Sequence, residues 1–465
     1  MDVLDAWYNI LPDLGFALPV DLPTPHRAEA TMSLRVPATL IRHEMSRDRW
    51  LTMPHEVRQR YAQWRPTPLR RARSFERLLG TRCRIYYKYE GANLCGSHKL
   101  NTAVAQAFYY RRAGARRLAV GTGAGQWGTA VAAACSMFGL DCTVYMVRSS
   151  YLAKPYRKTI MEMLGARVVP SPSLHTESGR RAGGPSQPGS LSVALAEALD
   201  DRQDPATHFC TGSGETYSLL HQTVIGLEAR EQLRELGEQP DVLVGALGGG
   251  SNLGGLTLPF IGASLRGEPP VRCVSVEPAA CPKLTRGRYA YDFTDASGMT
   301  PLQKMYTLGS TFAPPDVHAG GLRYHATAKL ISALYHRRFI EARAYPQRAV
   351  FASAVAFAKA EGILPAPESG HAVHGAVMEA RQADEQRDSR AILIGVSGHG
   401  LFDMAAYQSH LDGTMVDAVA SEDQIAAALA RLPQQPLERD ETAPESGPIG
   451  TARRRAAARR RDGRL

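Results

Sequence analysis

Short apolar runs alternate with helix-like segments along most of the chain. Arg84–Tyr89 has the length and aromatic content of a strand, and Lys99–Arg112 has the pattern of a helix. Leu118–Val120 and Asp141–Met146 predict two more strands, with a small-residue helix over Gly128–Phe138 between them. This order of strand, loop, helix and strand predicts a parallel α/β sheet.

The second half of the chain shows the same alternation, which indicates a second α/β unit from about residue 210. Its strands are expected at Val242–Gly245, Arg272–Val276 and Ala391–Gly395. Residues 171–192 are rich in Ser, Pro and Gly and predict a connecting loop. The fold class is therefore α/β, with two open parallel-sheet domains. We expect an N-terminal extension over residues 1–65 with a helix near 55–61, an N-terminal α/β domain over 66–209, a C-terminal α/β domain over 210–437 and a disordered basic tail over 438–465.

The net charge of +10 is concentrated at the C-terminus. The last fifteen residues hold seven Arg and one Asp, so their charge is seven minus one, or +6. A low-complexity basic end is typical of a solvated, disordered tail, and no DNA- or RNA-binding module accompanies it. We therefore do not expect nucleic acid as a partner.

Neither the N-terminus nor the cysteine spacing indicates export. The first five residues are acidic, and no segment approaches the ~20 apolar residues of a membrane span. The seven Cys are scattered and lack CxxC or Cys/His spacing, so disulfides and a metal site are not expected. These features predict a soluble, cytoplasmic protein that does not associate with membranes.

Two glycine-rich loops, each between a strand and a helix, carry the first candidate chemistry. Leu247–Asn252 contains three consecutive glycines, whose backbone N–H groups and following helix start suit a phosphate. A tight turn that merely needs small residues is the alternative. Thr122–Gly128 is a second anion loop with polar side chains. Two such loops suit a ligand pair with two anionic ends, such as a phosphate and an amino-acid carboxylate.

Three single residues add to this pattern. Lys99 follows His98 at a helix start, where the ammonium form is disfavoured and Schiff-base chemistry is aided; a surface lysine is the alternative. Ser397 follows an apolar strand, at the end of a sheet where ligands bind in open α/β folds. Glu368 lies in a segment stiffened by Pro365 and Pro367, although a lone Glu is usually a solvated charge.

Several longer motifs occur in one order along the chain. They are Arg65-Pro66-Thr67-Pro68-Leu69, Tyr87-Lys88-Tyr89-Glu90-Gly91, Gly96-Ser97-His98-Lys99, the segment 220–228 and the segment 318–325. Together with the loops above, they resemble the tryptophan synthase β family of fold-type II pyridoxal-phosphate enzymes. The resemblance covers about residues 35–410 and is closest to the second, longer branch, whose members carry an N-terminal extension.

The resemblance implies pyridoxal 5'-phosphate as cofactor, an amino acid as substrate and a mobile subdomain that closes over it, with a monovalent cation as a further candidate. Lys99 would form the Schiff base and move the α-proton, Glu368 would lie near the ring, and Ser397 would bind the pyridine nitrogen. A neutral partner there favours β-replacement over transamination. The implied catalytic residues are Lys99 and Glu368; the cofactor-binding residues are His98, Lys99, Asn101, Gly248, Gly249, Gly250, Ser251, Asn252, Glu368 and Ser397; the substrate-binding residues are Thr122, Gly123, Ala124, Gly125, Gln126 and Trp127. A homodimer is implied, and an α-subunit partner stays open.

One position departs from the family's pattern. The residue before Thr-Gly-Ala-Gly-Gln is a glutamate in the family and assists loss of the serine hydroxyl, whereas here it is Gly121. A general acid–base group contributes roughly 10²–10⁴-fold in rate. The donor therefore has a better leaving group, or the nucleophile is intrinsically strong, or another carboxylate takes over, with Glu215 as the candidate. On this basis Gly121→Glu is expected to raise activity with indole.

The function predicted is a lyase that forms an aminoacrylate from L-serine or a related amino acid and adds a nucleophile such as indole at the β-carbon. A serine or threonine dehydratase and a specialised enzyme that forms C–C or C–S bonds are alternatives. A non-catalytic protein that binds the cofactor is a third, but Lys99 beside both anion loops argues against it.

Overall fold

The large sheet of the protein has six strands in the order β13, β10, β9, β14, β4, β3. All neighbours are parallel except β3, which runs antiparallel to β4 at the edge. The computed structural model describes residues 2–23, 35–212 and 214–434, so the tail expected over 438–465 lies outside the described residues. The strands are β3 (Leu69–Arg71), β4 (Arg84–Tyr89), β9 (Val242–Ala246), β10 (Arg272–Pro278), β13 (Glu341–Tyr345) and β14 (Ala391–Val396).

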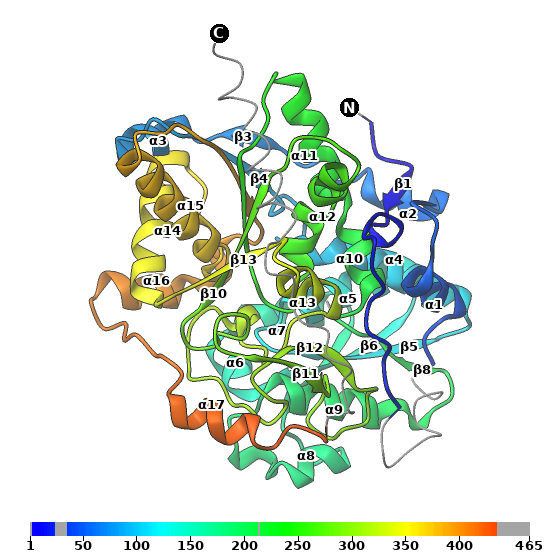
Figure 1. The fold of residues 1–465 in the computed structure, drawn as a ribbon. Coiled ribbons are helices and arrows are strands. Elements are labelled where there is room, and N and C mark those ends of the chain that lie inside the picture. The colour runs from blue at the N-terminus through cyan, green and yellow to red at the C-terminus, as the bar shows by residue number, and fades with distance from the viewer. Residues whose placement is uncertain (1, 24–34, 213, 435–465) are drawn as a thin grey trace.

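Helices cover both faces of this sheet, as Figure 1 shows. Strands β9, β10 and β14 are buried along their whole length, which explains why β9 and β14 are continuous apolar runs without alternation. One face is covered by α3 (Arg73–Leu79), α14 (Gln347–Glu361) and α15 (Pro367–Glu385), and the other by α10 (Thr216–Gln222), α11 (Val224–Glu235), α12 (Ser251–Leu265) and α13 (Lys329–His336).

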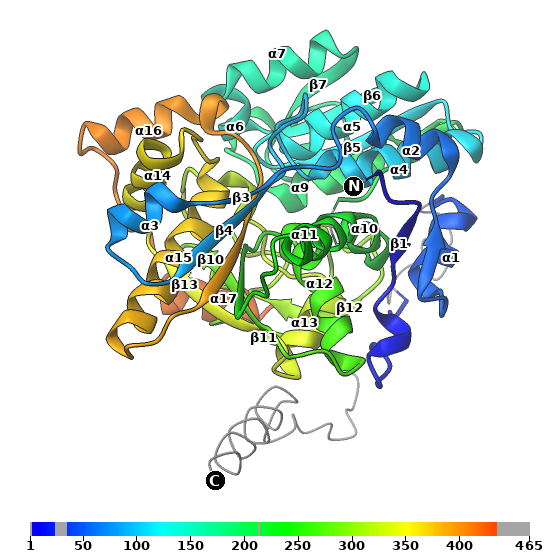
Figure 2. The same cartoon turned by 90° about the horizontal axis from the view of Figure 1, so that it is seen from above.

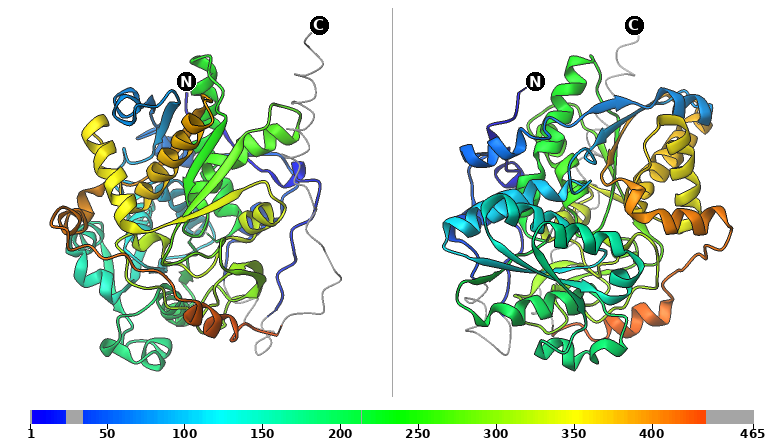
Figure 3. Two further views of the ribbon diagram at one scale, coloured as in Figure 1. Left: turned by 60° about the vertical axis from the view of Figure 1, so that its left-hand side comes forward. Right: turned by 180° about the vertical axis from the view of Figure 1, so that it is seen from behind.

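A smaller parallel sheet has the order β7, β6, β5, β8 and lies beside the large one (Figures 2 and 3). Its strands are β5 (Arg117–Thr122), β6 (Asp141–Val147), β7 (Ala166–Ser171) and β8 (Thr207–Phe209). Helices α4 (Lys99–Arg112), α5 (Gln126–Phe138), α6 (Arg148–Ala153) and α7 (Pro155–Met163) lie on one side of it, and α9 (Leu191–Asp200) packs on β5 and β6. The predicted strands and helices of both units are confirmed.

Strand β4 departs from chain order. It lies in the first half of the chain, within the segment expected to form the N-terminal domain, yet it pairs with β14 near the C-terminus. The central strand β14 is buried and needs a hydrogen-bonded neighbour on each side, which β9 and β4 provide. The two sheets therefore do not separate at residue 209, and the domain boundaries stay a prediction.

The segment 171–192 is not a loop throughout, so this prediction was wrong in part. It contains the short helix α8 (Glu177–Arg181), whose first turn is capped because Thr176 Oγ1 accepts a hydrogen bond of 3.1 Å from the Gly179 N–H. The following helix α9 is capped in the same way by Ser190. The antiparallel pair β11 (Arg288–Asp292) and β12 (Gln303–Thr307) was also not predicted.

The N-terminal extension packs along α4 and α10 (Figure 1). It contains β1 (Ala6–Tyr8), α1 (Ala38–Met45), β2 (Trp50–Thr52) and α2 (His55–Tyr61), and the last of these confirms the expected helix. Trp7 and Tyr8 join a buried apolar cluster that continues through α4 and α5 to α12. At the C-terminal end, α16 (Met404–Leu411) and α17 (Glu422–Leu429) follow β14. None of the helices in the described ranges has the length and apolar character needed to cross a bilayer.

Candidate active site

The site lies where the carboxyl ends of β4, β5, β9 and β14 lead into loops and helix starts. Ligands in open α/β sheets bind at this edge, because the loops after parallel strands converge there. Two adjacent cavities open at this place, with volumes of about 50 and 110 Å³. Lys99, the first residue of α4, lines both. We call them the cofactor cavity and the substrate cavity, after the ligands expected from the sequence.

The glycine loop between β9 and α12 forms one wall of the cofactor cavity. A Cβ on Gly248 would lie 2.5 Å from the carbonyl oxygen of Gly321, so only glycine permits this approach of two backbones. Gly250 has φ +123° and precedes the first residue of α12, a conformation that L side chains rarely adopt. The loop thus presents backbone N–H groups and the start of a long helix to the cavity, as an anion requires.

His98 connects the two polar ends of the cofactor cavity. Its Nε2 lies 3.0 Å from Ser251 Oγ, and its Nδ1 lies 2.5 Å from Ser397 Oγ. The backbone N–H of His98 also donates to Ser397 Oγ, over 3.0 Å. Burial, reinforced by the charge of Lys99, lowers the pKa of His98 to about 3. The imidazole is therefore neutral and holds Ser251 and Ser397 in place as a donor–acceptor pair.

Lys99 lies at the junction of the two cavities. Burial lowers the pKa of its ammonium group to about 8, and the carboxylate of Glu368 partly opposes this. A substantial fraction of the amine is therefore neutral near physiological pH. A neutral amine is the nucleophilic form that bonds to a carbonyl carbon.

Glu368 links the two anion loops. It lies in the first turn of α15, whose first residue is Pro367. Its Oε1 accepts hydrogen bonds from Gln126 Nε2 (2.7 Å) and from the Gly321 N–H (2.8 Å). Its Oε2 is buried and has no hydrogen-bond partner among the described residues. One oxygen therefore fixes the carboxylate, and the other stays available to a donor on a ligand.

The loop after β5 forms a wall of the substrate cavity. Five of its six predicted residues line the cavity, namely Thr122, Gly123, Ala124, Gln126 and Trp127. Gly125 does not line this cavity; its φ of +93° turns the chain into α5, and a Cβ there would lie 3.2 Å from Arg157 Cβ. The N-terminal end of α5 consequently points at the cavity, which suits a carboxylate.

Gly121 is explained by packing. A Cβ at this position would lie 2.6 Å from the backbone N of Leu195 and 2.7 Å from the carbonyl carbon of Ala194, both in α9. Backbone atoms of a packed helix cannot give way cheaply, so α9 and a side chain at position 121 exclude one another. This packing argues against the expectation that Gly121→Glu raises activity, because the side chain would meet the α9 backbone, and that expectation stays a prediction.

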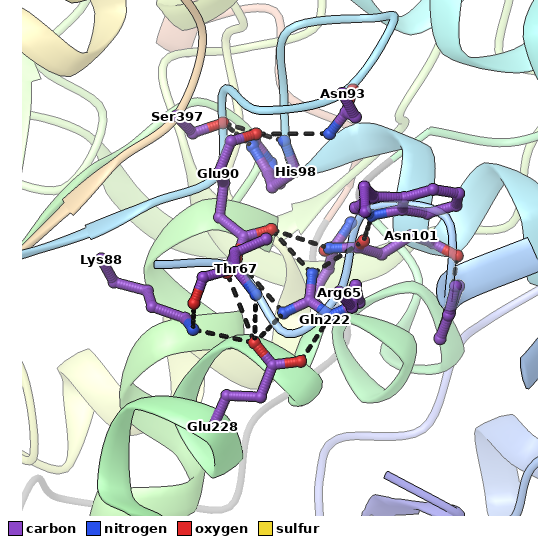
Figure 4. Close-up of polar contacts among 12 residues, drawn as sticks. Arg65, Thr67, Lys88, Glu90, Asn93, His98, Asn101, Gln222, Glu228 and Ser397 are labelled. Atoms are coloured by element: carbon purple, nitrogen blue, oxygen red, sulfur yellow. Dashed lines mark hydrogen bonds and ion pairs between the residues drawn. The ribbon is translucent and has the colours of Figure 1, made fainter. Parts of the chain in front are cut away.

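Asn101 is the predicted cofactor residue that does not line either cavity. Its Oδ1 accepts a hydrogen bond of 3.0 Å from Arg65, and its Nδ2 donates to Gln222 Oε1 over the same distance (Figure 4). The side chain is fully buried. Asn101 thus anchors the first turn of α4, two residues beyond Lys99.

The partners of Asn101 form a buried ionic network, shown in Figure 4. Arg65 lies 2.8 Å from Glu90 and 2.8 Å from Glu228, and Lys88 Nζ lies 2.8 Å from Glu228. Burial raises the pKa of Glu90, but Arg65 and Lys88 outweigh it and the net pKa falls to about 2. The network joins the end of the extension to β4, α4 and α11, and so holds the start of α4 against the large sheet.

Several residues of the cavities come from segments that carry no sequence motif. The cofactor cavity also contains Arg157 from α7 and Phe402, and Arg157 stacks over the Phe402 ring at 4.6 Å. His399 lies two residues after Ser397 in the same loop, which was the available signal for it. Strand β12 and the loops on either side of it contribute four polar residues to the substrate cavity, namely Thr294, Thr300, Gln303 and Tyr324.

Comparisons with known proteins agree with this geometry. The family described as "Pyridoxal-phosphate dependent enzyme" matches residues 61–398. "Tryptophan synthase beta chain 2" of Aeropyrum pernix is 50% identical over 90% of this chain and 95% of its own length. The protein of the same name from Thermotoga maritima is 50% identical over 86% and 96%.

A solved structure shares the fold. An L-serine ammonia-lyase from the fungus Rhizomucor miehei superposes with a TM-score of 0.56, covering 75% of this chain and 98% of that one, at 15% identity. The resemblance stated from the motifs is confirmed. The chain belongs to the tryptophan synthase β chain family of pyridoxal-phosphate dependent enzymes.

Proposed function

We propose that this protein replaces the β-substituent of L-serine, or of a related amino acid, with a nucleophile such as indole. The observation that carries the proposal is the position of Lys99 between two cavities, each with its own anion loop. The 50% identity to proteins named tryptophan synthase β chain 2 supports the same reaction class.

Two features of the cofactor cavity fit pyridoxal phosphate. A Cβ on Gly248 would collide with Gly321 in the wall of the cradle, Gly250 turns the loop with a positive φ, and Glu368 offers an oxygen without a partner among the described residues. When bound, the cofactor withdraws electrons from the substrate's α-carbon. We infer that the loop residues Gly248, Gly249, Gly250, Ser251 and Asn252 hold its phosphate beside His98, that Ser397 faces its ring nitrogen and that Lys99 attaches it.

The protein's own residues then orient the substrate and move its protons. The loop from Thr122 to Trp127 holds the substrate carboxylate at the start of α5. Gln126 donates a hydrogen bond to Glu368, and this bond fixes the position of the carboxylate site relative to the cofactor site. The Lys99 amine accepts the α-proton, because its lowered pKa leaves it able to act as a base near neutral pH.

Assembly and cellular location are also part of this proposal. The seven cysteines are buried and free, which fits a reducing cytoplasm. The homodimer implied by the resemblance stays a prediction, and an α-subunit partner stays open. The basic tail lies outside the described residues and is given no role.

The direct test is a product screen by mass spectrometry. The purified holoenzyme is incubated with L-serine, O-acetyl-L-serine or O-phospho-L-serine, with and without indole or a thiol, and D-serine is the matched control. We expect an adduct at the β-carbon from an L-donor and none from D-serine. Pyruvate alone, in every mixture, would identify a dehydratase. No consumption of any donor would contradict both reactions.

A further inference from the structure

Besides the loop after β5, polar residues from other elements line the substrate cavity. We propose that Glu215 is its acid–base residue, which protonates the group leaving the β-carbon and then accepts the proton of the incoming nucleophile. This inference rests on the proposed function and names a second residue of the substrate cavity, besides Lys99, that exchanges protons with the substrate.

Glu215 is placed for this role by the start of α10. It immediately precedes the first residue of that helix and lines the substrate cavity together with Lys99 and Gly121. Its Oε2 accepts a long hydrogen bond of 3.4 Å from Gln303 Nε2. Of the described residues that line the cavity, those that titrate are Lys99, Glu215 and Tyr324. Glu215 carries the one carboxyl group of this set.

The charges around Glu215 favour its protonated form. Lys329 from α13 is the neighbouring cation, but its Nζ already lies 3.0 Å from Glu44 and 3.1 Å from Asp21. Three carboxyl groups therefore share one ammonium group. Burial and the negative charge of Glu44 raise the pKa of Glu215 to about 8, with Lys329 opposing this and Asp21 adding to it.

The other titratable neighbours do not compete for the role. Tyr110, Tyr217 and Tyr324 face Glu215 from α4, α10 and the segment after β12, and burial raises the pKa of each well above its usual value. These phenols keep their protons in the physiological range. Glu215 is thus the group on this wall that changes protonation near neutral pH.

The exclusion of a side chain at position 121 supports Glu215 as the acid–base residue. The backbone of α9 leaves no space for a side chain on Gly121, so a carboxylate cannot come from β5. Glu215 approaches the same cavity from another element. It also lies in the wall of an outer cavity of about 850 Å³, which residues of the N-terminal extension line as well.

The proton balance closes without a further reactant. As the Cβ–O bond of serine breaks, its electron pair stays on oxygen, and the Glu215 proton converts that oxygen to water. As the new bond to the β-carbon forms, the nucleophile's proton passes to the Glu215 carboxylate. Serine and the protonated nucleophile become the β-substituted amino acid and water, and Glu215 ends protonated again.

The test compares leaving groups in the Glu215→Gln holoenzyme. Hydroxide needs a proton to leave, whereas the chloride of β-chloro-L-alanine does not. With no nucleophile added, we expect the rate of β-elimination in the variant to fall roughly 10²–10⁴-fold with L-serine and less than about tenfold with β-chloro-L-alanine. Glu215→Asp, which retains a carboxyl group, should recover part of the serine activity.

Glu44→Gln is the matched control. It makes the same replacement of a carboxyl group by an amide, in a residue that lines the outer cavity and not the substrate cavity. With serine, wild-type activity should fall as pH rises through about 8, because Glu215 loses its proton. Glu44→Gln should move this fall to lower pH by removing a like charge. A pH dependence caused by Lys99 should appear with both L-serine and β-chloro-L-alanine. The fall caused by Glu215 should appear with L-serine alone, so the two can be separated.

A stability measurement tests the same proton without any turnover. The folded-state pKa of Glu215 is about 8 against an ordinary 4.5, so the folded state holds a proton that the unfolded state has lost between these values. Wild-type stability should fall as pH rises across this window, and Glu215→Gln should remove that contribution. Thermal unfolding at pH 5 and pH 8.5 measures it.

The outcomes separate the two proposals. Equal losses with serine and β-chloro-L-alanine would assign Glu215 a structural role, and no loss with serine would overturn its role outright. If the wild-type enzyme forms no adduct from any donor, the proposed function fails instead, whatever the variant does.

Discussion

The two halves of the active site are built in different ways. The cofactor cavity is formed by element ends that the sequence motifs already mark, namely the start of α4, the glycine loop before α12 and Ser397 after β14. The substrate cavity shares one such loop, but its opposite wall comes from the start of α10 and from the β11–β12 region, with the N-terminal extension behind it. The cofactor is thus more firmly determined than the chemistry performed on the substrate.

Two glycines show the difference at atomic scale. Gly248 lets the carbonyl of Gly321 approach, and the result is a cradle of backbone N–H groups. Gly121 lets α9 approach β5, and the result is the exclusion of any side chain from that wall. The absence of a side chain thus shapes the cofactor cavity at Gly248. At Gly121 it leaves no place for an acid–base group on β5, so in the substrate cavity that group comes from another element.

Lys99→Ala should have the largest effect, because it removes the group that attaches the cofactor. We expect replacement activity to fall by roughly 10⁴-fold or more. Borohydride reduction followed by peptide mass spectrometry should find the phosphopyridoxyl group on Lys99 in the wild type. Lys359→Ala, on the exposed side of α14, is the control and should behave as the wild type. Attachment at another lysine would contradict the assignment of the cofactor half.

Arg65→Met should have the next largest effect, on the framework that holds α4. Removing the guanidinium leaves Glu90 buried without its ion-pair partner and Glu228 with Lys88 alone, and breaking a buried pair in this way typically costs about 3–5 kcal/mol. Arg71→Met, which breaks the partly buried pair with Glu76, should cost less. Chemical denaturation of the two variants measures the difference. Similar small losses of stability in both variants would mean that the buried ionic network does not hold α4 and the cofactor cavity in place.

Gly121→Ala should have the smallest of the three effects. The added Cβ meets the α9 backbone, and overpacking of this kind costs about 1–3 kcal/mol. Gly212→Ala, whose Cβ would meet nothing closer than 3.9 Å, is the matched substitution in the same cavity and should change stability by less than about 0.5 kcal/mol. Thermal unfolding compares them. Equal melting temperatures would show that α9 yields, and the steric account of the substrate half would fail.

Much of the fold was predictable because its elements are local. The helix over Lys99–Arg112 and the strand over Arg84–Tyr89 have the predicted bounds. The partner of that strand was not predictable, since pairing of β4 with β14 joins segments that are far apart in the chain. Helix α8 was missed because the glycines and prolines of the segment 171–192 outweighed the capping signal of Thr176.

The residues of the candidate site also divide into those that local sequence predicted and those that depend on tertiary contacts. Thr122, Ser251 and Ser397 were predicted and do line the cavities, because each lies at or just beyond the end of a strand that is readable in the sequence. Asn101 was predicted as a cofactor residue, but its side chain bonds to Arg65 and Gln222. The reason is that Asn101 lies on a side of α4 that does not line either cavity. Glu215 was one open candidate among three explanations, and its neighbours Glu44, Asp21 and Lys329 are distant in the chain.

The sequence by itself determined the fold class, the family and the cofactor, because strand periodicity, glycine loops and the lysine at a helix start act within a few residues of the chain. Only the tertiary structure decided why position 121 is glycine and which carboxyl group faces the substrate. The physical reason is that both depend on contacts between separate elements: the approach of α9 to β5, and three carboxyl groups gathered around one lysine.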